Sequence, residues 1–358
     1  MRRLLDWTLL VPVLALVALA LTWGRHLGAV LVVVVAVLLA GAVLAAVHHA
    51  EVVAHRVGEP FGSLVLAVAV TVIEVALIVT LMISGGPATA SLARDTVFAA
   101  VMITTTGIVG LSLLVGARRY GVTLFNAEGS GAALATVATL ATMSLVLPTF
   151  TTSQPGPEFS PGQLTFAALA SLALYGMFVL TQTVRHRDFF LPVSQNTDAD
   201  THAEPPTTRA AFTSLGLLMV ALVAVVGLAK VESPAIEDGV EAAGFPPSFV
   251  GVVIALLVLA PETLAAVRAA RRGRVQISLN LAYGSAMASI GLTIPTIALA
   301  SVWLDGPLLL GLGATQMVLL ALTVVVSVLT VVPGRATRLQ GGVHLVLLAA
   351  FIFLAINP

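Results

Sequence analysis

Cysteine is absent from this chain and charged side chains are scarce. Without cysteine among its 358 residues, the protein has no disulfide, no thiolate metal site and no cysteine nucleophile. Only 9% of the residues are charged, and 17 acidic side chains balance 17 basic ones. A net charge of zero does not favour a nucleic-acid partner, because such partners are held mainly by clustered positive charge. We therefore expect none.

Apolar sequence makes up most of the chain. Hydrophobic residues account for 58% of it, and the mean hydropathy is +1.06. Runs of about 20 apolar residues recur, and each is long enough to cross roughly 30 Å of hydrocarbon as a helix. The pattern predicts an all-α polytopic membrane protein with about eleven transmembrane helices. We place them at 7–23, 28–47, 61–84, 96–117, 131–151, 163–184, 211–230, 247–270, 277–302, 307–332 and 341–357.

The basic residues are distributed unevenly over the loops of this layout. Three of the 17, Arg25, Arg94 and Lys230, fall on one side, and the remaining fourteen fall on the side of the N-terminus. Cytoplasmic loops of membrane proteins are enriched in arginine and lysine. The distribution predicts a cytoplasmic N-terminus and an external C-terminus. Arg2 and Arg3 before the first apolar run also fit a signal peptide, but we expect this run to remain as a membrane helix.

A polar, partly acidic stretch divides the spans into two sets. We predict a leading helix in residues 1–27, a first five-helix repeat in 28–184, a cytoplasmic linker in 185–210 and a second five-helix repeat in 211–358. Because five is odd, the two repeats have opposite topology. Inverted repeats with a substrate site at the middle of the membrane are a recurrent transporter design.

Two glutamates lie near the middle of long apolar runs. Glu74 is in the second span of the first repeat and Glu262 in the second span of the second repeat. A carboxylate at this depth costs about 2.5–3.5 kcal/mol on insertion scales, so such residues are usually functional. We predict that the pair forms one shared site for a cation and protons, and that it supplies the metal ligands.

Other oxygen atoms are needed beside the glutamates. A hard cation such as Ca²⁺ takes six to eight oxygen ligands, more than two carboxylates provide. Hydroxyl groups of Thr71 and Ser285 are candidates, and we expect Pro261 to break its helix and free backbone carbonyls. In an apolar site, a carboxylate binds a proton unless a cation compensates its charge. Cation and proton would then exclude one another, which alternating access converts into exchange.

Several motifs resemble the calcium/cation antiporter superfamily, especially its bacterial calcium, sodium or potassium/proton antiporters. The pattern Glu-x-x-Ala at Glu51–Ala54 and the sequence Gly-Glu-Pro-Phe-Gly at 58–62 resemble family elements, as does the step of twelve residues from Gly62 to Glu74. Ser-x-x-x-Ala-x-Gly-Ser at 278–285, followed by Pro295, resembles the span after the second glutamate. Two shorter elements also fit, Phe125-Asn126 and Leu339-Gln340-Gly341.

The resemblance covers the chain and implies a secondary active antiporter of the bacterial inner membrane. It implies Ca²⁺ as the exchanged cation, with Na⁺ and K⁺ as open alternatives. Many relatives have Gly-Asn-Ala before each glutamate, where this chain has other residues at 71–73 and 259–261. Where a glutamine often follows the Gly-Ser pair, this chain has Ala288.

Four further residues have both a functional and a structural interpretation. Gly284 and Thr104 either line the cation pathway or allow close helix packing. Glu51 and Glu59, at the cytoplasmic end of their spans, either form a cation-attracting vestibule or a proton relay, or belong to a solvated loop with a helix cap. We expect Glu232–Glu241 to be a loop outside the membrane.

Two other classes of function remain as alternatives to transport. One is an intramembrane hydrolase that uses the paired carboxylates, but it would need a motif such as His-Glu-x-x-His at depth, and we expect no histidine in the middle of a span. The other is a non-transporting structural subunit. For the transporter we expect no bound cofactor, cations and protons as substrates, and the lipid bilayer as surroundings. The oligomeric state stays open.

Overall fold

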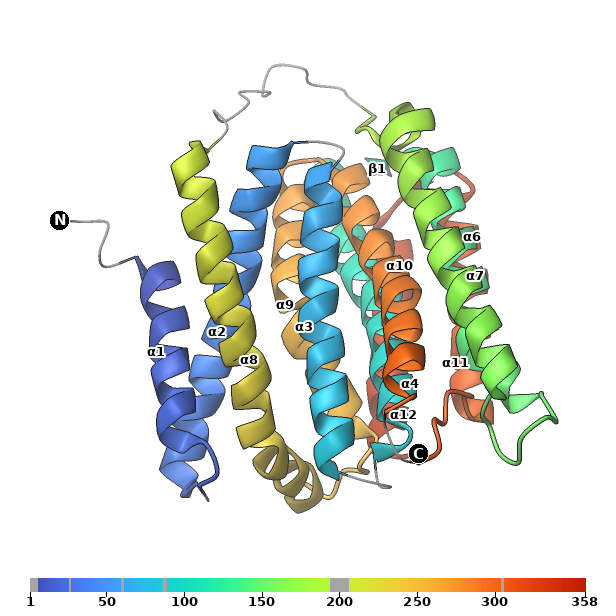
Figure 1. Ribbon diagram of the computed structural model, residues 1–358. Coiled ribbons are helices and arrows are strands. Elements are labelled where there is room, and N and C mark those ends of the chain that lie inside the picture. Colours follow the sequence, from blue (N-terminus) through green and yellow to red (C-terminus); the bar gives the residue numbers. More distant parts are fainter. Residues whose placement is uncertain (1–5, 26, 59–60, 86–88, 194–205, 304–305) are drawn as a thin grey trace. The chain divides into compact units, whose positions relative to one another are not determined.

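The computed structural model describes residues 6–25, 27–58, 61–85, 89–193, 206–303 and 306–358, and nearly all of this part is helical (Figure 1). Short 3₁₀ and π segments, labelled η, interrupt or end several helices. The long elements are α1 (Trp7–Thr22), α2 (Ala29–Val57), α3 (Phe61–Gly85), α4 (Leu92–Met102), η3 (Ile103–Ile108), α5 (Val109–Tyr120), α6 (Ala127–Ala141), α7 (Pro161–Leu180), α8 (Thr208–Ala242), α9 (Phe249–Arg271), α10 (Val275–Ala300), α11 (Ala314–Val331) and α12 (Arg338–Ile356).

Each predicted span has a helix in the structure, with α4, η3 and α5 forming one of them. Among the described residues, nine helices are long and apolar enough to cross a membrane, and two shorter apolar helices lie at Trp7–Thr22 and Ala69–Ile83. The eleven-helix prediction and the all-α class are therefore confirmed.

Three predicted helix boundaries are wrong. The α8 helix runs for 35 residues, so Glu232–Glu241 is helical and not a loop. The α2 helix continues to Val57, ten residues beyond the predicted end at 47, so Glu51 also lies in a helix. Both errors have one cause: hydropathy locates the edge of the hydrocarbon, whereas a helix continues as long as its backbone hydrogen bonds do. The α11 helix begins at Ala314, after a non-helical stretch, and not at 307.

The chain forms two compact units. Unit 1 comprises residues 1–89 and 201–250, and unit 2 comprises 90–200 and 251–358. Unit 1 thus combines α1, α2 and α3 with α8. Within it, α8 packs along α2, α1 and α3, and Figure 1 shows α1, α2 and α8 side by side.

Unit 2 has the α4–α5 span and α10 at its core. In the α4–α5 span 89% of the most apolar stretch is buried. In α12 the corresponding share is 22%, so this helix has a large exposed face. The α10 helix packs against α4, η3, α5, α6 and α7. Contact with α7 is close at Gly291, where an added Cβ would lie 2.7 Å from the Cβ of Tyr175.

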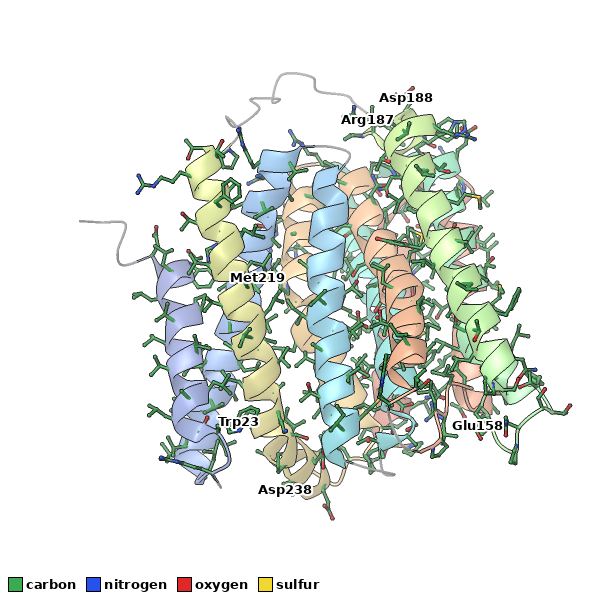
Figure 2. All side chains as sticks on the ribbon, in the orientation of Figure 1. Trp23, Glu158, Arg187, Asp188, Met219 and Asp238 are labelled. Atoms are coloured by element: carbon green, nitrogen blue, oxygen red, sulfur yellow. The ribbon has the colours of Figure 1, made fainter. Side chains whose placement is uncertain are left out.

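One end of unit 2 joins loops that the alternating topology places on the same side of a membrane. Strand β1 (Thr123–Leu124) pairs antiparallel with β2 (Arg335–Ala336). The guanidinium of Arg338 donates to the carbonyl of Arg118 at 3.2 Å. Arg187 lies at this end of the unit, beyond α7 (Figure 2).

The opposite end of unit 2 joins the remaining loops. The amide of Leu312 donates to the carbonyl of Leu145 at 2.8 Å, and the Arg94 guanidinium donates to the carbonyl of Gly311 at 3.3 Å. Glu158 lies at this end (Figure 2). At each end of unit 2, hydrogen bonds therefore connect loops that lie at that same end. This is the arrangement expected when successive spans alternate in direction.

The two units do not follow the two sequence repeats. Residues 1–89 combine the predicted leading helix with the start of the first repeat, and 201–250 belong mostly to the start of the second. The division at 27, 184 and 210 describes order along the sequence and stays a prediction. Much of the predicted linker, residues 194–205, lies outside the described part of the chain.

Candidate functional site

Glu74 lies near the middle of α3, on its buried face. The side chain is only 4% exposed, and that of Thr71, one turn earlier, is 5% exposed. Val72, on another face of the same helix, is 44% exposed. Residues three apart on a helix are neighbours. The α3 helix therefore presents a carboxylate and a hydroxyl group together in the interior.

Glu262 has a similar place in α9. It is 6% exposed, and Leu264 on another face is half exposed. The predicted break at Pro261 is wrong, because α9 is helical from Phe249 through Arg271 with the proline inside it. Backbone groups in an apolar medium must stay hydrogen-bonded, which favours a continuous helix. Since proline has no N–H, it leaves only the carbonyl of Leu257, four residues earlier, without its helical donor.

Contacts on both sides of Glu262 along α9 fix this helix in unit 2. At Gly251 the helix lies so close to α4 that an added Cβ would be 2.8 Å from the amide nitrogen of Thr96. The hydroxyl of Ser278 in α10 donates to the carbonyl of Ala266 at 2.7 Å. Ala266 is one helical turn after Glu262. In the sequence Ser278 is part of the Ser-x-x-x-Ala-x-Gly-Ser motif, and in the structure its hydroxyl joins α10 to α9.

The two glutamates belong to different units, Glu74 to unit 1 and Glu262 to unit 2. Within its own unit, each is a buried carboxylate near the middle of an apolar helix. Their union in one site stays a prediction. No group of three or more histidine, aspartate or glutamate side chains that could hold a metal occurs among the described residues.

A π-helical turn contains Thr104 in the middle of the α4–α5 span. The turn runs from Ile103 to Ile108, and the side chains of Thr104, Thr105 and Thr106 are at most 2% exposed. Each of the three hydroxyls donates to a carbonyl one turn earlier, that of Thr105 to Val101 at 2.6 Å. Their remaining lone pairs can accept a hydrogen bond or bind a cation. Single π-helical turns are frequent at functional sites.

The α10 helix brings Gly284 and Ser285 into the same unit. Both are partly buried, and Ala288, where relatives often have glutamine, is 4% exposed. The α10 helix packs against η3, so the helix that carries Ser285 lies beside the turn that contains Thr104. Unit 2 thus contains Glu262, Thr104 and Ser285 on α9, η3 and α10, and α10 contacts both other elements.

The predicted cytoplasmic vestibule is described only in part. Glu51 lies within α2 and is partly buried, so it is neither a loop residue nor a cap. Glu59 lies outside the described residues.

His344 is a buried residue that sequence reasoning missed. It is the seventh of the 19 residues of α12 and its side chain is fully buried, so a histidine does lie in the interior of a predicted membrane helix. The imidazole Nδ1 is 2.9 Å from the carbonyl oxygen of Thr105, and Nε2 is 3.1 Å from the hydroxyl of Thr330. Its position as the fourth residue of the predicted last span was the available signal. The hydrolase alternative gains nothing, because His344 is not part of a cluster of acidic or metal-binding side chains among the described residues.

Comparison with known proteins gives a consistent result. The family described as "Sodium/calcium exchanger protein" matches residues 27–184 and again 213–357. The protein y4hA of Sinorhizobium fredii, named an ionic transporter, is 45% identical over 98% of this chain and 96% of its own length. The sodium-potassium/proton antiporter ChaA of Escherichia coli is 36% identical over 97% of this chain and 95% of its own length.

A solved structure has the same fold. The crystal structure of the H⁺/Ca²⁺ exchanger CAX superposes with a TM-score of 0.66, over 97% of this chain and 91% of that one, at 16% sequence identity. At this identity the likeness supports the fold alone.

Proposed function

The chain belongs to the sodium/calcium exchanger protein family, and from that premise we propose that it exchanges K⁺, Na⁺ or Ca²⁺ for protons, with Glu74 and Glu262 as the shared binding groups. It is a multi-pass membrane transporter and not an enzyme, in line with relatives named as antiporters. The observation that carries the proposal is the pair of buried carboxylates, 4% and 6% exposed, each near the middle of an apolar helix.

The chemistry of these carboxylates supports coupling between cation and proton. A buried carboxylate needs a compensating positive charge, and either a proton or a metal cation provides it. Because ligand carboxylates must be deprotonated, cation binding releases protons. Occupation by one ion thus excludes the other, and access alternating between the two sides converts that exclusion into antiport.

The available oxygen atoms suit a monovalent cation better than they suit Ca²⁺. The asparagines of the calcium-type motif are absent before both glutamates, and Ala288 stands where a glutamine often occurs. Ca²⁺ takes six to eight oxygen ligands and would need several waters here. The 36% identity with an antiporter named for sodium and potassium points the same way. We therefore propose K⁺ and Na⁺ as principal substrates and Ca²⁺ as a further one.

The distribution of arginines supports a cytoplasmic N-terminus in the bacterial inner membrane. Fourteen of the 17 basic residues lie in loops or helix ends assigned to the N-terminal side. Among them are Arg118, Arg335 and Arg338, which the β1–β2 pair and the neighbouring hydrogen bond hold at one end of unit 2. Arg94 is at the other end.

The test uses purified full-length protein in liposomes with a trapped pH indicator. After a proton gradient is set, K⁺, Na⁺, Ca²⁺ and Mg²⁺ are added in turn, and dissipation of the gradient is measured. We expect exchange with K⁺ and Na⁺, weaker exchange with Ca²⁺ and none with Mg²⁺. Each of Glu74→Gln and Glu262→Gln should lower exchange more than about a hundredfold, because a neutral amide cannot balance a cation at a buried site.

The matched control is Glu128→Gln, which removes the same charge from an exposed position in the first turn of α6. It should exchange at the wild-type rate. Wild-type exchange rates in either glutamate variant would show that the carboxylates do not carry the coupling.

A further inference from the structure

His344 is a polar side chain buried between helices of unit 2, and it takes no part in the proposed carboxylate chemistry. Its side chain is fully buried where α12 crosses the π-helical turn, and both ring nitrogens have a partner. A carbonyl oxygen only accepts hydrogen bonds, so Nδ1 carries a proton and donates to the carbonyl of Thr105. The second contact, from Nε2 to the hydroxyl of Thr330 in α11, fixes the plane of the ring.

The Thr105 carbonyl needs this donor because of the π-helical turn. In a regular α-helix the amide of Val109 would donate to the carbonyl of Thr105, four residues earlier. Here that amide is directed to the carbonyls of Thr104 and Thr106 instead. His344 therefore supplies a donor to a carbonyl that does not receive its usual α-helical donor, the amide of Val109. A buried carbonyl left without a donor is costly, which ties the turn to the histidine.

Close packing of glycines holds the two helices at this distance. A Cβ added to Gly110 would lie 3.0 Å from the Cβ of His344 and 3.1 Å from the carbonyl oxygen of Gly341. A Cβ added to Gly341 would lie 2.6 Å from the amide nitrogen of Leu114. The backbones of α5 and α12 thus touch one turn away from the histidine. The hydrogen bond from His344 to Thr105 is part of a crossing with little room for movement.

We infer that His344 is a positioning residue for cation exchange: its Nδ1–H bond to Thr105 keeps residues 103–108 in the π-helical turn that directs the Thr104–Thr106 hydroxyls. Without this bond, a regular α-helical hydrogen bond from Val109 to Thr105 becomes the alternative, and the three hydroxyls change direction. The inference rests on the proposed function, since the threonines matter to transport only if they line the cation pathway. It concerns binding of the cation and not the proton chemistry of the glutamates.

Two substitutions separate the two hydrogen bonds of the imidazole. In His344→Asn the amide nitrogen reaches the place of Nδ1, so the bond to Thr105 is kept and the contact with Thr330 is lost. In His344→Gln the amide reaches the place of Nε2, so the bond to Thr105 is lost. Half-saturating K⁺ and Na⁺ concentrations and maximal rates are measured in the liposome assay. Thermal unfolding of the detergent-solubilised protein, with and without K⁺, gives a readout of binding that needs no transport.

We expect His344→Gln to raise the half-saturating cation concentration about tenfold, as for loss of one buried hydrogen bond, and to change the ratio of the K⁺ and Na⁺ values. His344→Asn should stay within about threefold of wild type, with an unchanged ratio. The stabilisation by K⁺ should be smaller in the glutamine variant than in the asparagine variant.

The outcomes that overturn the inference differ from those that overturn the function. If the glutamate variants abolish exchange but both histidine variants bind cations like the wild type, or both weaken binding equally, His344 has no positioning role. If the wild type neither exchanges cations nor is stabilised by them, the proposed function is wrong, and the role of His344 in it is excluded as well.

Discussion

The two helices that carry the buried glutamates, α3 and α9, have the same apolar character and differ in what accompanies the carboxylate. Glu74 has the buried hydroxyl of Thr71 one turn earlier, in a helix without proline. Glu262 follows Pro261, which leaves the carbonyl of Leu257 without a helical donor. If the proposed cation site exists, α3 would offer it a side-chain oxygen and α9 a backbone oxygen. Two similar buried carboxylates can thus have different kinds of oxygen atom beside them, a hydroxyl in α3 and a backbone carbonyl in α9.

The largest effect should come from shortening each carboxylate. Glu74→Asp and Glu262→Asp keep the charge and withdraw it by one methylene. A displacement of about 1 Å at a binding centre can cost about a hundredfold in rate, so we expect losses of that order in both variants. Liposome exchange rates check this. Tolerance of aspartate at one position only would break the equivalence of the two helices and leave a single essential carboxylate.

An intermediate effect is expected at Thr71. Thr71→Val keeps the shape and removes the hydroxyl, and we expect it to raise the half-saturating K⁺ concentration about fivefold. Thr71→Ser is the matched control, because it keeps the hydroxyl, and it should remain within about twofold of the wild type. Equal affinities in the valine and serine variants would show that the α3 hydroxyl takes no part in binding.

The smallest effect on transport should come from Pro261→Ala. Alanine restores the amide that donates to the Leu257 carbonyl, so a backbone oxygen is withdrawn from the site. We expect exchange to fall about threefold, while the helix becomes more stable by about 1–3 kcal/mol, which thermal unfolding would detect. Unchanged exchange with raised stability would remove the backbone oxygen from the comparison between α3 and α9.

Much of the fold was predictable because membrane helices follow hydropathy closely. Each apolar run corresponds to a helix, and Glu74 and Glu262 were recognisable as charges within such runs. The ends of α2 and α8 were not, since α2 and α8 continue past their apolar runs through polar residues such as Glu51 and Glu232. The sequence pattern therefore locates the spans better than it locates their ends.

The π-helical turn and its histidine could not be predicted for a different reason. Within the turn, the carbonyl of Thr105 is hydrogen-bonded to His344, which is 239 residues away in the chain. Local propensity contains no information on such a contact. Pro261 shows the opposite error, because a local rule predicted a break where the apolar surroundings favour an unbroken helix.

Proton release on cation binding tests the central claim most directly. K⁺, Na⁺ or Ca²⁺ is added to purified protein in weakly buffered detergent solution, and the released protons are measured with a pH indicator. The account predicts release by the wild type, with the half-saturating cation concentration rising up to about tenfold for each unit by which the pH is lowered, since proton and cation compete. It predicts no release by the double variant Glu74→Gln, Glu262→Gln. Cation binding without proton release, or equal release by the double variant, would contradict it.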